Sequence, residues 1–373
     1  MKPNAFFSLA LFLISAHALC GVAGAGIALP VSLYTPPGGQ GTGLGGAYTA
    51  VAGGVYGQRW NPAGPALVRH LTVSSAYLYT HNADRNLNYQ IGVGPVLNRV
   101  TGAHLFGGVV IPPARWTLGT GVGVYLARYE LPGVEWRDEN GGVEVRDAQG
   151  YVRRVPNGTF NFSDQTLMLS LSRRGILSDP VLGRISLGVN FTLLRQNGAS
   201  KNQSSGFSAG LGLIHELSRR FRYGLALRNL YGRMKRADGI RDRLERELAL
   251  GVTRWMQAGR NDSLMVSLDL VKAAGQVWSL NAGMEYRLDV GPGKWLAVRG
   301  GLERAFPATR NDPRIPALVK GYGRTSPVLG IGYMARLLGR LFYTVDYAID
   351  ADLNQAIATV GRRHNVNISF EIR

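Results

Sequence analysis

The chain has 373 residues and a formal net charge of +18, and 50 of its residues are glycine. This length allows two ordinary domains or one large barrel, and the absence of a collagen-like glycine period excludes a collagen-like fibre. The single cysteine, Cys20, excludes a disulfide framework. The positive charge indicates an anionic partner. Because no element interleaves aromatic and basic residues, we expect phosphorylated surface lipid rather than nucleic acid.

The N-terminus has the pattern of a secretory signal peptide. A basic start at residues 1–2 precedes an apolar core at residues 5–14, and two small-x-small cleavage candidates end at Ala18 and Ala25. The apolar core is shorter than the ~20 residues that a membrane-spanning helix needs. Cys20 lacks the small preceding residue expected of a lipoprotein. We therefore predict a signal peptide at residues 1–25 and export of the mature chain.

The next stretch, residues 43–64, is rich in glycine and small apolar residues, and its one charged residue is Arg59. It has too few large side chains to build a core of its own. Pro62 fixes a kink, and Asn61 can accept a hydrogen bond from its own backbone in a turn. We predict that residues 26–70 lie inside a closed structure built by the rest of the chain.

The remainder reads as a series of long strands. Residues 278–288 alternate between Trp278, Leu280, Met284 and other apolar residues on one face and polar residues on the other. The same period of two predicts strands at 71–79, 88–96, 104–111, 118–128, 166–172, 184–194, 206–214, 222–229, 247–254, 263–270, 294–303, 340–349 and 365–372. Strands of ~9–11 residues suit a bilayer crossing, whereas soluble strands average ~5–6.

The connections distinguish a membrane barrel from a soluble sandwich. Short links alternate with links that are mostly longer and more polar. The short links are 216–221, 256–262, 289–293 and 337–339, and the long ones are 129–164, 197–205, 231–246, 304–325 and 350–362. Bacterial outer-membrane barrels have this asymmetry. It places the C-terminus on the short-turn side and permits two of the first three candidate strands, which gives about 14 strands, with 12 or 16 as alternatives.

We therefore predict an all-β fold, a transmembrane antiparallel up-and-down β-barrel over residues 71–373, in the bacterial outer membrane with the N-terminal hatch inside its lumen. The apolar faces would expose far more than the few hundred Å² that a soluble monomer tolerates. An open sheet edge is excluded in lipid, so the sheet has to close.

No motif in the sequence predicts an enzyme, a cofactor or a metal site. Residues 41–46 match GxGxxG, but no buried strand precedes them and no acid follows before Asp84. The six histidines show no metal-ligand spacing, and there is no P-loop or nucleophile elbow. Asp346, Asp350 and Asp352 could bind a cation, although charges of this kind more commonly face a lumen or lie in loops.

Charged residues on the polar strand faces are candidates for the lumen. They are Arg228, Glu247, Asp269, Glu285, Arg287, Arg299, Asp346 and Glu371. Acids and bases that face one another across a lumen either hold a plug and a water network or select a substrate, and the first is the more common arrangement.

Residues 45–52 (GGAYTAVA) followed by residues 60–64 (WNPAG) resemble the N-terminal signature of FadL-like outer-membrane long-chain fatty-acid transporters, and more specifically of their PorV/PorQ-like branch. The resemblance implies a 14-stranded barrel with a hatch. The implied hatch or gate residues are Gly45, Gly46, Ala47, Tyr48, Trp60, Asn61, Pro62 and Ala63. Two features depart from the pattern: Gly53-Gly54 replaces the usual acids, and the chain ends on Arg373 rather than on an aromatic residue.

The resemblance leaves three functions open. The leading hypothesis is passage or binding of a hydrophobic, fatty-acid-like ligand, as in the transporters. The second is a component of a protein secretion or surface-attachment machine, as in the PorV/PorQ-like branch, and the third is a purely structural barrel. Residues 130–156 are mostly charged and polar, with Trp136 as the lone tryptophan, which favours a protein or lipid-headgroup partner on the outside.

Overall fold

The computed structural model describes most of the chain from residue 38 onward. The described residues are 38–82, 101–136, 143–146, 152–155, 157–198, 203–236, 239–273, 278–305, 324–354 and 359–373. The predicted signal peptide, residues 26–37 of the predicted hatch and the candidate strand 88–96 lie outside these ranges.

Three short helices precede the strands in the described part of the chain: α3 (Gly39–Gly43), α4 (Gly54–Trp60) and the 3-10 helix η1 (Gly64–Leu67). A second 3-10 helix, η2, spans Arg115–Thr117. The strands are β1 (Leu71–Asn82), β2 (Thr101–Ile111), β3 (Thr120–Trp136), β4 (Val143–Arg146), β5 (Val152–Val155), β6 (Gly158–Asp179), β7 (Gly183–Asn197), β8 (Gln203–Ser218), β9 (Phe221–Lys235), β10 (Arg241–Arg243), β11 (Glu247–Gln257), β12 (Ser263–Ala273), β13 (Trp278–Gly291), β14 (Lys294–Ala305), β15 (Arg324–Leu338), β16 (Leu341–Asn354) and β17 (Thr359–Ile372). No helix among the described residues is long and apolar enough to cross a bilayer.

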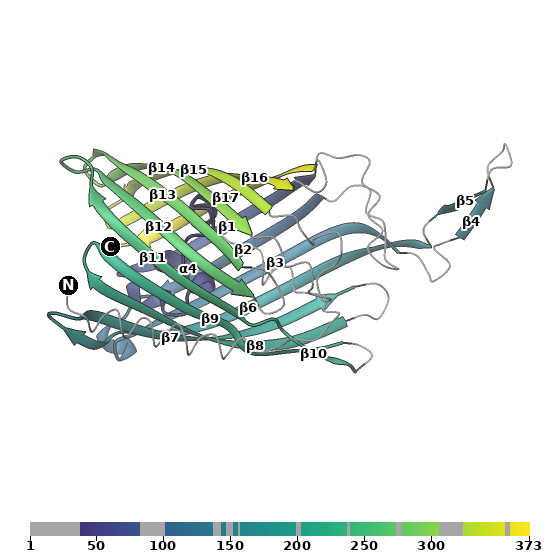
Figure 1. Ribbon diagram of the computed structural model, residues 1–373, viewed down its shortest axis with the longest axis horizontal. Helices are drawn as coiled ribbons and strands as arrows, with labels where there is room; N and C mark the ends of the chain where they lie inside the picture. Colours follow the sequence, from purple (N-terminus) through teal and green to yellow (C-terminus); the bar gives the residue numbers. More distant parts are fainter. Residues whose placement is uncertain are drawn as a thin grey trace.

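The main sheet closes on itself as an antiparallel barrel of 14 long strands (Figure 1). Successive long strands pair with each other, and the last strand, β17, pairs with the first, β1, so that Leu71 lies opposite Ile372. The three-residue β10 adds a short extra pairing to β9. The predicted fold class and the count of about 14 strands are confirmed.

Side chains alternate between the outside and the inside of the barrel, as the period of two predicts. On β13, Leu280 and Met284 are exposed on the outer surface, whereas Asn281 and Glu285 are buried inside. Because every long strand carries such an outer apolar stripe, the barrel presents a continuous apolar band to its surroundings. This band is the surface that a bilayer covers.

The two ends of the barrel differ as expected, but the strands are longer than the sequence indicated. Short turns such as 180–182, 219–220 and 339–340 lie at the end that carries the C-terminus (Figure 1). At the other end, much of the predicted loops 129–164 and 350–362 is strand, because β3, β6, β16 and β17 continue past the apolar band. The sequence of these extensions mixes charged, polar and apolar residues, so it lacks the uninterrupted apolar stripe that predicts a strand in lipid.

Residues 38–70, which we call the inner segment, lie inside the barrel. Helix α3 contacts β14–β17, α4 contacts β1–β3, and η1 contacts β3, β6 and β7. The inner segment also approaches the backbone of β8, β9, β11 and β13 closely, so it touches the wall around the lumen (Figure 1).

Candidate functional site

Glycines of the barrel wall let the inner segment approach the strands backbone to backbone. A Cβ added at Gly188, Gly224, Gly283 or Gly301 would lie between 2.2 and 2.4 Å from a backbone atom of the inner segment, closer than real Cβ contacts occur. These residues lie on four different strands, at inward positions. The glycine content of the strands therefore follows from the close fit of the inner segment.

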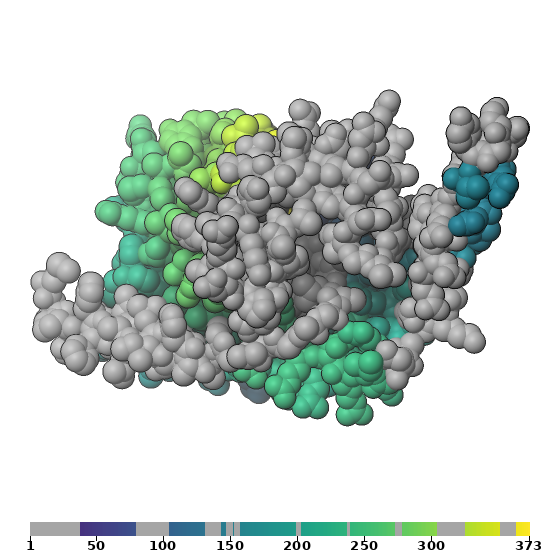
Figure 2. Space-filling model, turned by 45° about the vertical axis from the view of Figure 1, so that its right-hand side comes forward, coloured from purple at the N-terminus to yellow at the C-terminus, as the bar shows by residue number. Residues whose placement is uncertain are grey.

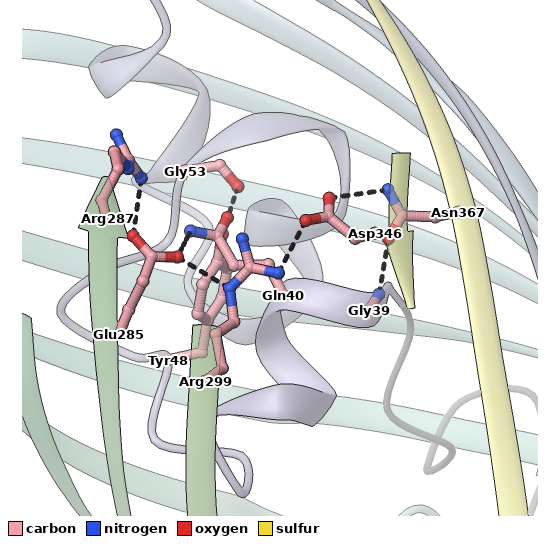
Figure 3. Close-up of polar contacts among 9 residues, drawn as sticks. All are labelled: Gly39, Gln40, Tyr48, Gly53, Glu285, Arg287, Arg299, Asp346 and Asn367. Atoms are coloured by element: carbon pink, nitrogen blue, oxygen red, sulfur yellow. Dashed lines mark hydrogen bonds and ion pairs between the residues drawn. The ribbon is translucent and has the colours of Figure 1, made fainter. Parts of the chain in front are cut away.

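A buried ionic network lies beside α3. Arg299 donates to Glu285 from Nε at 2.7 Å and to Asp346 from Nη1 at 2.6 Å. Arg287 donates to the other oxygen of Glu285 at 2.6 Å. The Arg299 side chain is fully buried, and those of Glu285 and Asp346 are 3% and 7% exposed. Two carboxylates and two guanidinium groups thus balance each other in the lumen wall (Figure 3).

This network holds the start of the inner segment directly. Gln40 donates from Nε2 to Glu285 at 3.1 Å, and Asn367, which donates to Asp346, accepts from the backbone nitrogen of Gly39 at 2.6 Å. The Tyr48 hydroxyl lies 2.7 Å from Gln40 Oε1 and 3.1 Å from the carbonyl oxygen of Gly53 (Figure 3). Because these bonds have fixed directions, they set both the position and the orientation of α3.

Two further polar side chains tie the middle of the inner segment. Asp269, on β12, accepts through Oδ2 from the backbone nitrogens of Tyr48 and Thr49 at 2.9 and 2.7 Å. Asn61 lies with its Nδ2 3.0–3.2 Å from the carbonyl oxygens of Thr49, Leu213 and Leu225. Its Oδ1 accepts a hydrogen bond from the backbone nitrogen of Ala63 at 3.0 Å. This bond forms the local turn that the sequence predicted. Asn61 thus joins the inner segment to β8 and β9.

The neighbouring part of the lumen wall, beyond β17, is apolar. Val55 and Tyr56 of α4 pack against a buried cluster, which we call the apolar side: Ala76, Leu78, Phe106, Val110, Tyr125, Ala127 and Met168 of β1, β2, β3 and β6. The Tyr56 and Tyr125 rings meet edge to face with centroids 6.4 Å apart. Among the residues that the structure describes, neither hydroxyl has a hydrogen-bond partner. The polar lumen face that alternation predicts is therefore interrupted on these first strands, because their inward side chains pack against α4.

The predicted lumen residues fall into separate groups. Glu285, Arg287, Arg299 and Asp346 form the ionic network, which we call the ionic side together with Asp269 and Asn367. Arg228 forms an ion pair with Glu247, and its guanidinium lies 6.0 Å from the centre of the Trp60 ring. Glu371 lies apart at the short-turn rim, paired with Arg373 at 3.0 Å.

The residues suggested by the resemblance all lie in the inner segment. Ala47, Asn61 and Ala63 are fully buried, and Tyr48 and Trp60 meet edge to face at 6.1 Å. Gly45 and Gly46 have positive φ angles of 61° and 81°, and a Cβ at Gly45 would lie 2.5 Å from the backbone nitrogen of Leu302. The backbone of Pro62 lies against Gly188 of β7. Their conformation fits a segment threaded along the wall.

Sequence reasoning missed Asn367, the wall glycines and the apolar side. The wall glycines could have been predicted from the sequence, since they recur on the inward faces of the strands. Nothing in the sequence pointed to Asn367, because its partner Gly39 is 328 positions away. The three aspartates considered for a cation are not grouped for one: Asp346 is paired with Arg299 and Asp350 with Arg363, and the side chain of Asp352 lies outside the described part.

No family model and no curated protein sequence matches this chain. Three solved structures are similar to it over nearly their whole length. A FadL homologue of Pseudomonas aeruginosa is 15% identical, with 90% of this chain and 98% of that chain covered and a TM-score of 0.51. The toluene transporter TbuX of Ralstonia pickettii is 13% identical, with 90% and 98% covered and a TM-score of 0.52. A deltaS2 mutant of the monoaromatic hydrocarbon channel TodX is 11% identical, with 92% and 99% covered and a TM-score of 0.54.

This likeness shows that the chain has the fold of FadL-like barrels. The three are a FadL homologue, a toluene transporter and a monoaromatic hydrocarbon channel. The finer resemblance to the PorV/PorQ-like branch stays a prediction.

Proposed function

We propose that this protein is an outer-membrane channel for hydrophobic small molecules and that the inner segment is its hatch. The protein has the fold of a toluene transporter and of a monoaromatic hydrocarbon channel. This likeness supports a hydrophobic small molecule as the solute. The observation that carries the proposal is the unequal attachment of the inner segment. Directional polar bonds hold α3 on the ionic side, whereas Val55 and Tyr56 of α4 rest on an apolar cluster.

The unequal attachment defines which contacts a solute could replace. Apolar contacts are non-directional and scale with the buried area, so a hydrophobic molecule can substitute for Val55 and Tyr56 against the wall at small cost. Water cannot do so, since it would gain few hydrogen bonds there. The unpartnered hydroxyls of Tyr56 and Tyr125 could bond one polar group of the solute. The expected substrate is therefore an aromatic or fatty-acid-like molecule with few polar groups.

A reversible cross-link tests whether the α4 end of the hatch has to move. Val55 of α4 and Val110 of β2 belong to the same buried cluster. Val110 already carries a side chain, whereas a Cβ at the neighbouring inward position Gly108 would lie 2.3 Å from the backbone oxygen of Val124. We expect Val55→Cys/Val110→Cys, in a Cys20→Ser background, to lose at least about tenfold of the initial rate of tracer uptake into liposomes when the two thiols are joined by a short, reducible bifunctional reagent. That loss corresponds to about 1.4 kcal/mol. Reduction with dithiothreitol should restore the rate.

The two single-cysteine variants are the matched controls, because they carry the same substitutions but cannot form the cross-link. If the cross-linked double variant takes up the tracer at the rate of its reduced form, the hatch does not have to move. If no form of the protein takes up toluene or a fluorescent fatty acid, the channel proposal itself is wrong.

A role in protein secretion or surface attachment is the second candidate. The observation that favours it is the β4–β5 hairpin, which pairs only with itself and projects from the long-loop end of the barrel (Figures 1 and 2). Deletion of residues 137–157 should then abolish recovery of a reproducible partner from detergent extracts without changing tracer uptake. If the full-length protein recovers no such partner, the secretion hypothesis is wrong.

A further inference from the structure

Two neighbouring rows of outward-facing residues cross β3 and β6–β10 toward the long-loop end of the barrel. The first row, in order of cross-strand pairing, is Arg128, Gln165, Arg195, Ser205, Lys235 and Arg241. The second row is Leu126, Leu167, Leu193, Phe207, Arg233 and Arg243. Six of these residues are basic and none is acidic, and all six basic side chains are exposed.

Four of the six are brought together by β9 and β10. Arg233 lies directly opposite Arg243, and Lys235 lies directly opposite Arg241. Like charges in directly opposite positions destabilise a strand pair. Among the residues that the structure describes, none of the four forms an ion pair with an acid. We call these four side chains the cationic quartet.

The acid between the two arginines of β10 faces away from the quartet. Asp242 lies between Arg241 and Arg243 in the sequence, but it alternates to the other face and pairs with Arg236. At the far end of the rows, the exposed Glu130 of β3 pairs with Arg128. Neither of these two acids therefore balances the charge of the quartet.

The quartet lies at the border of the apolar band. Leu126, Leu167 and Leu193 are exposed in the same row as Arg233. Phe207 and Tyr231, both nearly half exposed, have ring centroids 5.6 Å apart, and the Arg233 guanidinium lies 5.4 Å from the centre of the Tyr231 ring. Exposed aromatic residues at the edge of an apolar band mark the lipid–water interface of a barrel. Long loops are external in such barrels, so the quartet is at the headgroup level of the outer leaflet.

We propose that Arg233, Lys235, Arg241 and Arg243 bind the phosphate groups of a phosphorylated lipid in the outer leaflet. A phosphate between the facing cations would remove their mutual repulsion, and guanidinium groups bind phosphate oxygens in pairs. The acyl chains of the same lipid would lie along Leu193 and Phe207. A free phosphate ion would satisfy the cations but would make no use of the apolar band beneath them. This site is on the outer wall and does not depend on the proposed channel.

Binding of three probes to the protein folded in neutral detergent tests this site. The probes are lipid A with two phosphates, dephosphorylated lipid A and inorganic phosphate, and binding is measured by native mass spectrometry and calorimetry. We expect the variant Arg233→Gln/Lys235→Gln/Arg241→Gln/Arg243→Gln to bind phosphorylated lipid A at least about tenfold more weakly than the wild type, since each basic residue at a membrane surface adds to the attraction.

The matched control removes four exposed cations at the short-turn end: Arg173→Gln, Arg184→Gln, Arg219→Gln and Arg220→Gln. It has the same net charge as the quartet variant and should bind phosphorylated lipid A as the wild type does. Heat-dependent migration on gels establishes that each variant is folded. Equal binding by the quartet variant and the control, or equal binding of both lipids by the wild type, would overturn the proposal. Competition by inorganic phosphate at concentrations similar to the lipid would assign the site to free phosphate instead and would also overturn it.

Discussion

On the ionic side of the lumen, α3 is held by hydrogen bonds to side chains of β13 and β17, and the ion pairs of Arg299 fix the network to which these side chains belong. On the apolar side, α4 rests on aliphatic and aromatic side chains. Directional bonds lose most of their energy after a displacement of about 1 Å, but apolar contacts change gradually with the buried area. The same segment therefore has a fixed end and an end that can be displaced. Four changes test this difference, from the largest expected effect to the smallest.

Replacement of the central cation should be the most damaging change on the ionic side. Arg299→Met leaves Glu285 and Asp346 buried without their shared partner, and breaking a buried ion pair costs about 3–5 kcal/mol. The free energy of unfolding in urea, measured in lipid vesicles, should fall by this amount. Arg287→Met is the control: its side chain is 38% exposed, its acidic partner among the described residues is Glu285, and its guanidinium lies 4.4 Å from the centre of the Trp295 ring. We expect the loss of these two partly exposed contacts to cost about 1–2 kcal/mol, less than Arg299→Met. Equal losses would mean that Arg299 does not organise the network.

Two adjacent glycines of β14 test how closely the inner segment fits the wall. A methyl group at Gly301 would lie 2.2 Å from the backbone nitrogen of Gly45, whereas one at Gly300 would meet nothing within 4 Å. Gly301→Ala should lower the free energy of unfolding by up to about 3 kcal/mol, as overpacking does. It should also speed proteolysis of residues 38–70. Gly300→Ala should leave both quantities unchanged, and a similar effect of the two variants would contradict backbone-to-backbone packing.

Asn61 joins the inner segment to β8 and β9, away from the ionic network, so its removal should loosen the hatch without destroying that network. Asn61→Ala leaves the carbonyl oxygens of Thr49, Leu213 and Leu225 without this donor. The expected loss is about 2 kcal/mol, in the range for unpaired buried groups, together with faster tracer uptake. Asn197→Ala, which removes a single bond to Ser163 at 3.0 Å, serves as the control. Unchanged uptake in Asn61→Ala would show that this tie does not limit hatch movement.

The sequence was sufficient to predict the strands of the barrel wall, but not the contacts that their side chains make inside the lumen. Alternation on β13 identified Glu285 as inward, and the same pattern on the other strands identified Arg299 and Asp346. A period of two gives the face of a residue, but not its partner across the barrel, because that depends on strand stagger and on what fills the lumen. Arg299 on β14 and Asp346 on β16 are 47 positions apart, and their side chains meet across the intervening strand β15. Their pairing could not be predicted from spacing.

The apolar side shows a second limit. Phe106 and Tyr125 are inward residues on strands whose outward residues, Leu105 and Leu126, are also apolar. Such strands show little contrast between their faces, so the sequence cannot say which face meets lipid. The inner segment resolves the ambiguity, because Val55 and Tyr56 provide an apolar partner inside the lumen.

Removing one tyrosine hydroxyl from the ionic side and one from the apolar side should change the free energy of unfolding least. It also compares the two sides most directly. The Tyr48 hydroxyl on the ionic side has partners in Gln40 and Gly53, so Tyr48→Phe should cost about 1 kcal/mol, the net value of a typical hydrogen bond. The Tyr125 hydroxyl on the apolar side is buried without a partner. Tyr125→Phe should therefore leave the free energy of unfolding unchanged or raise it by less than about 1 kcal/mol, because no bond is lost and an unpaired polar group is removed. Matched urea titrations of the two variants measure the difference. If Tyr125→Phe were as destabilising as Tyr48→Phe, the hydroxyl of Tyr125 would have a partner, and the two sides would hold the inner segment by the same means.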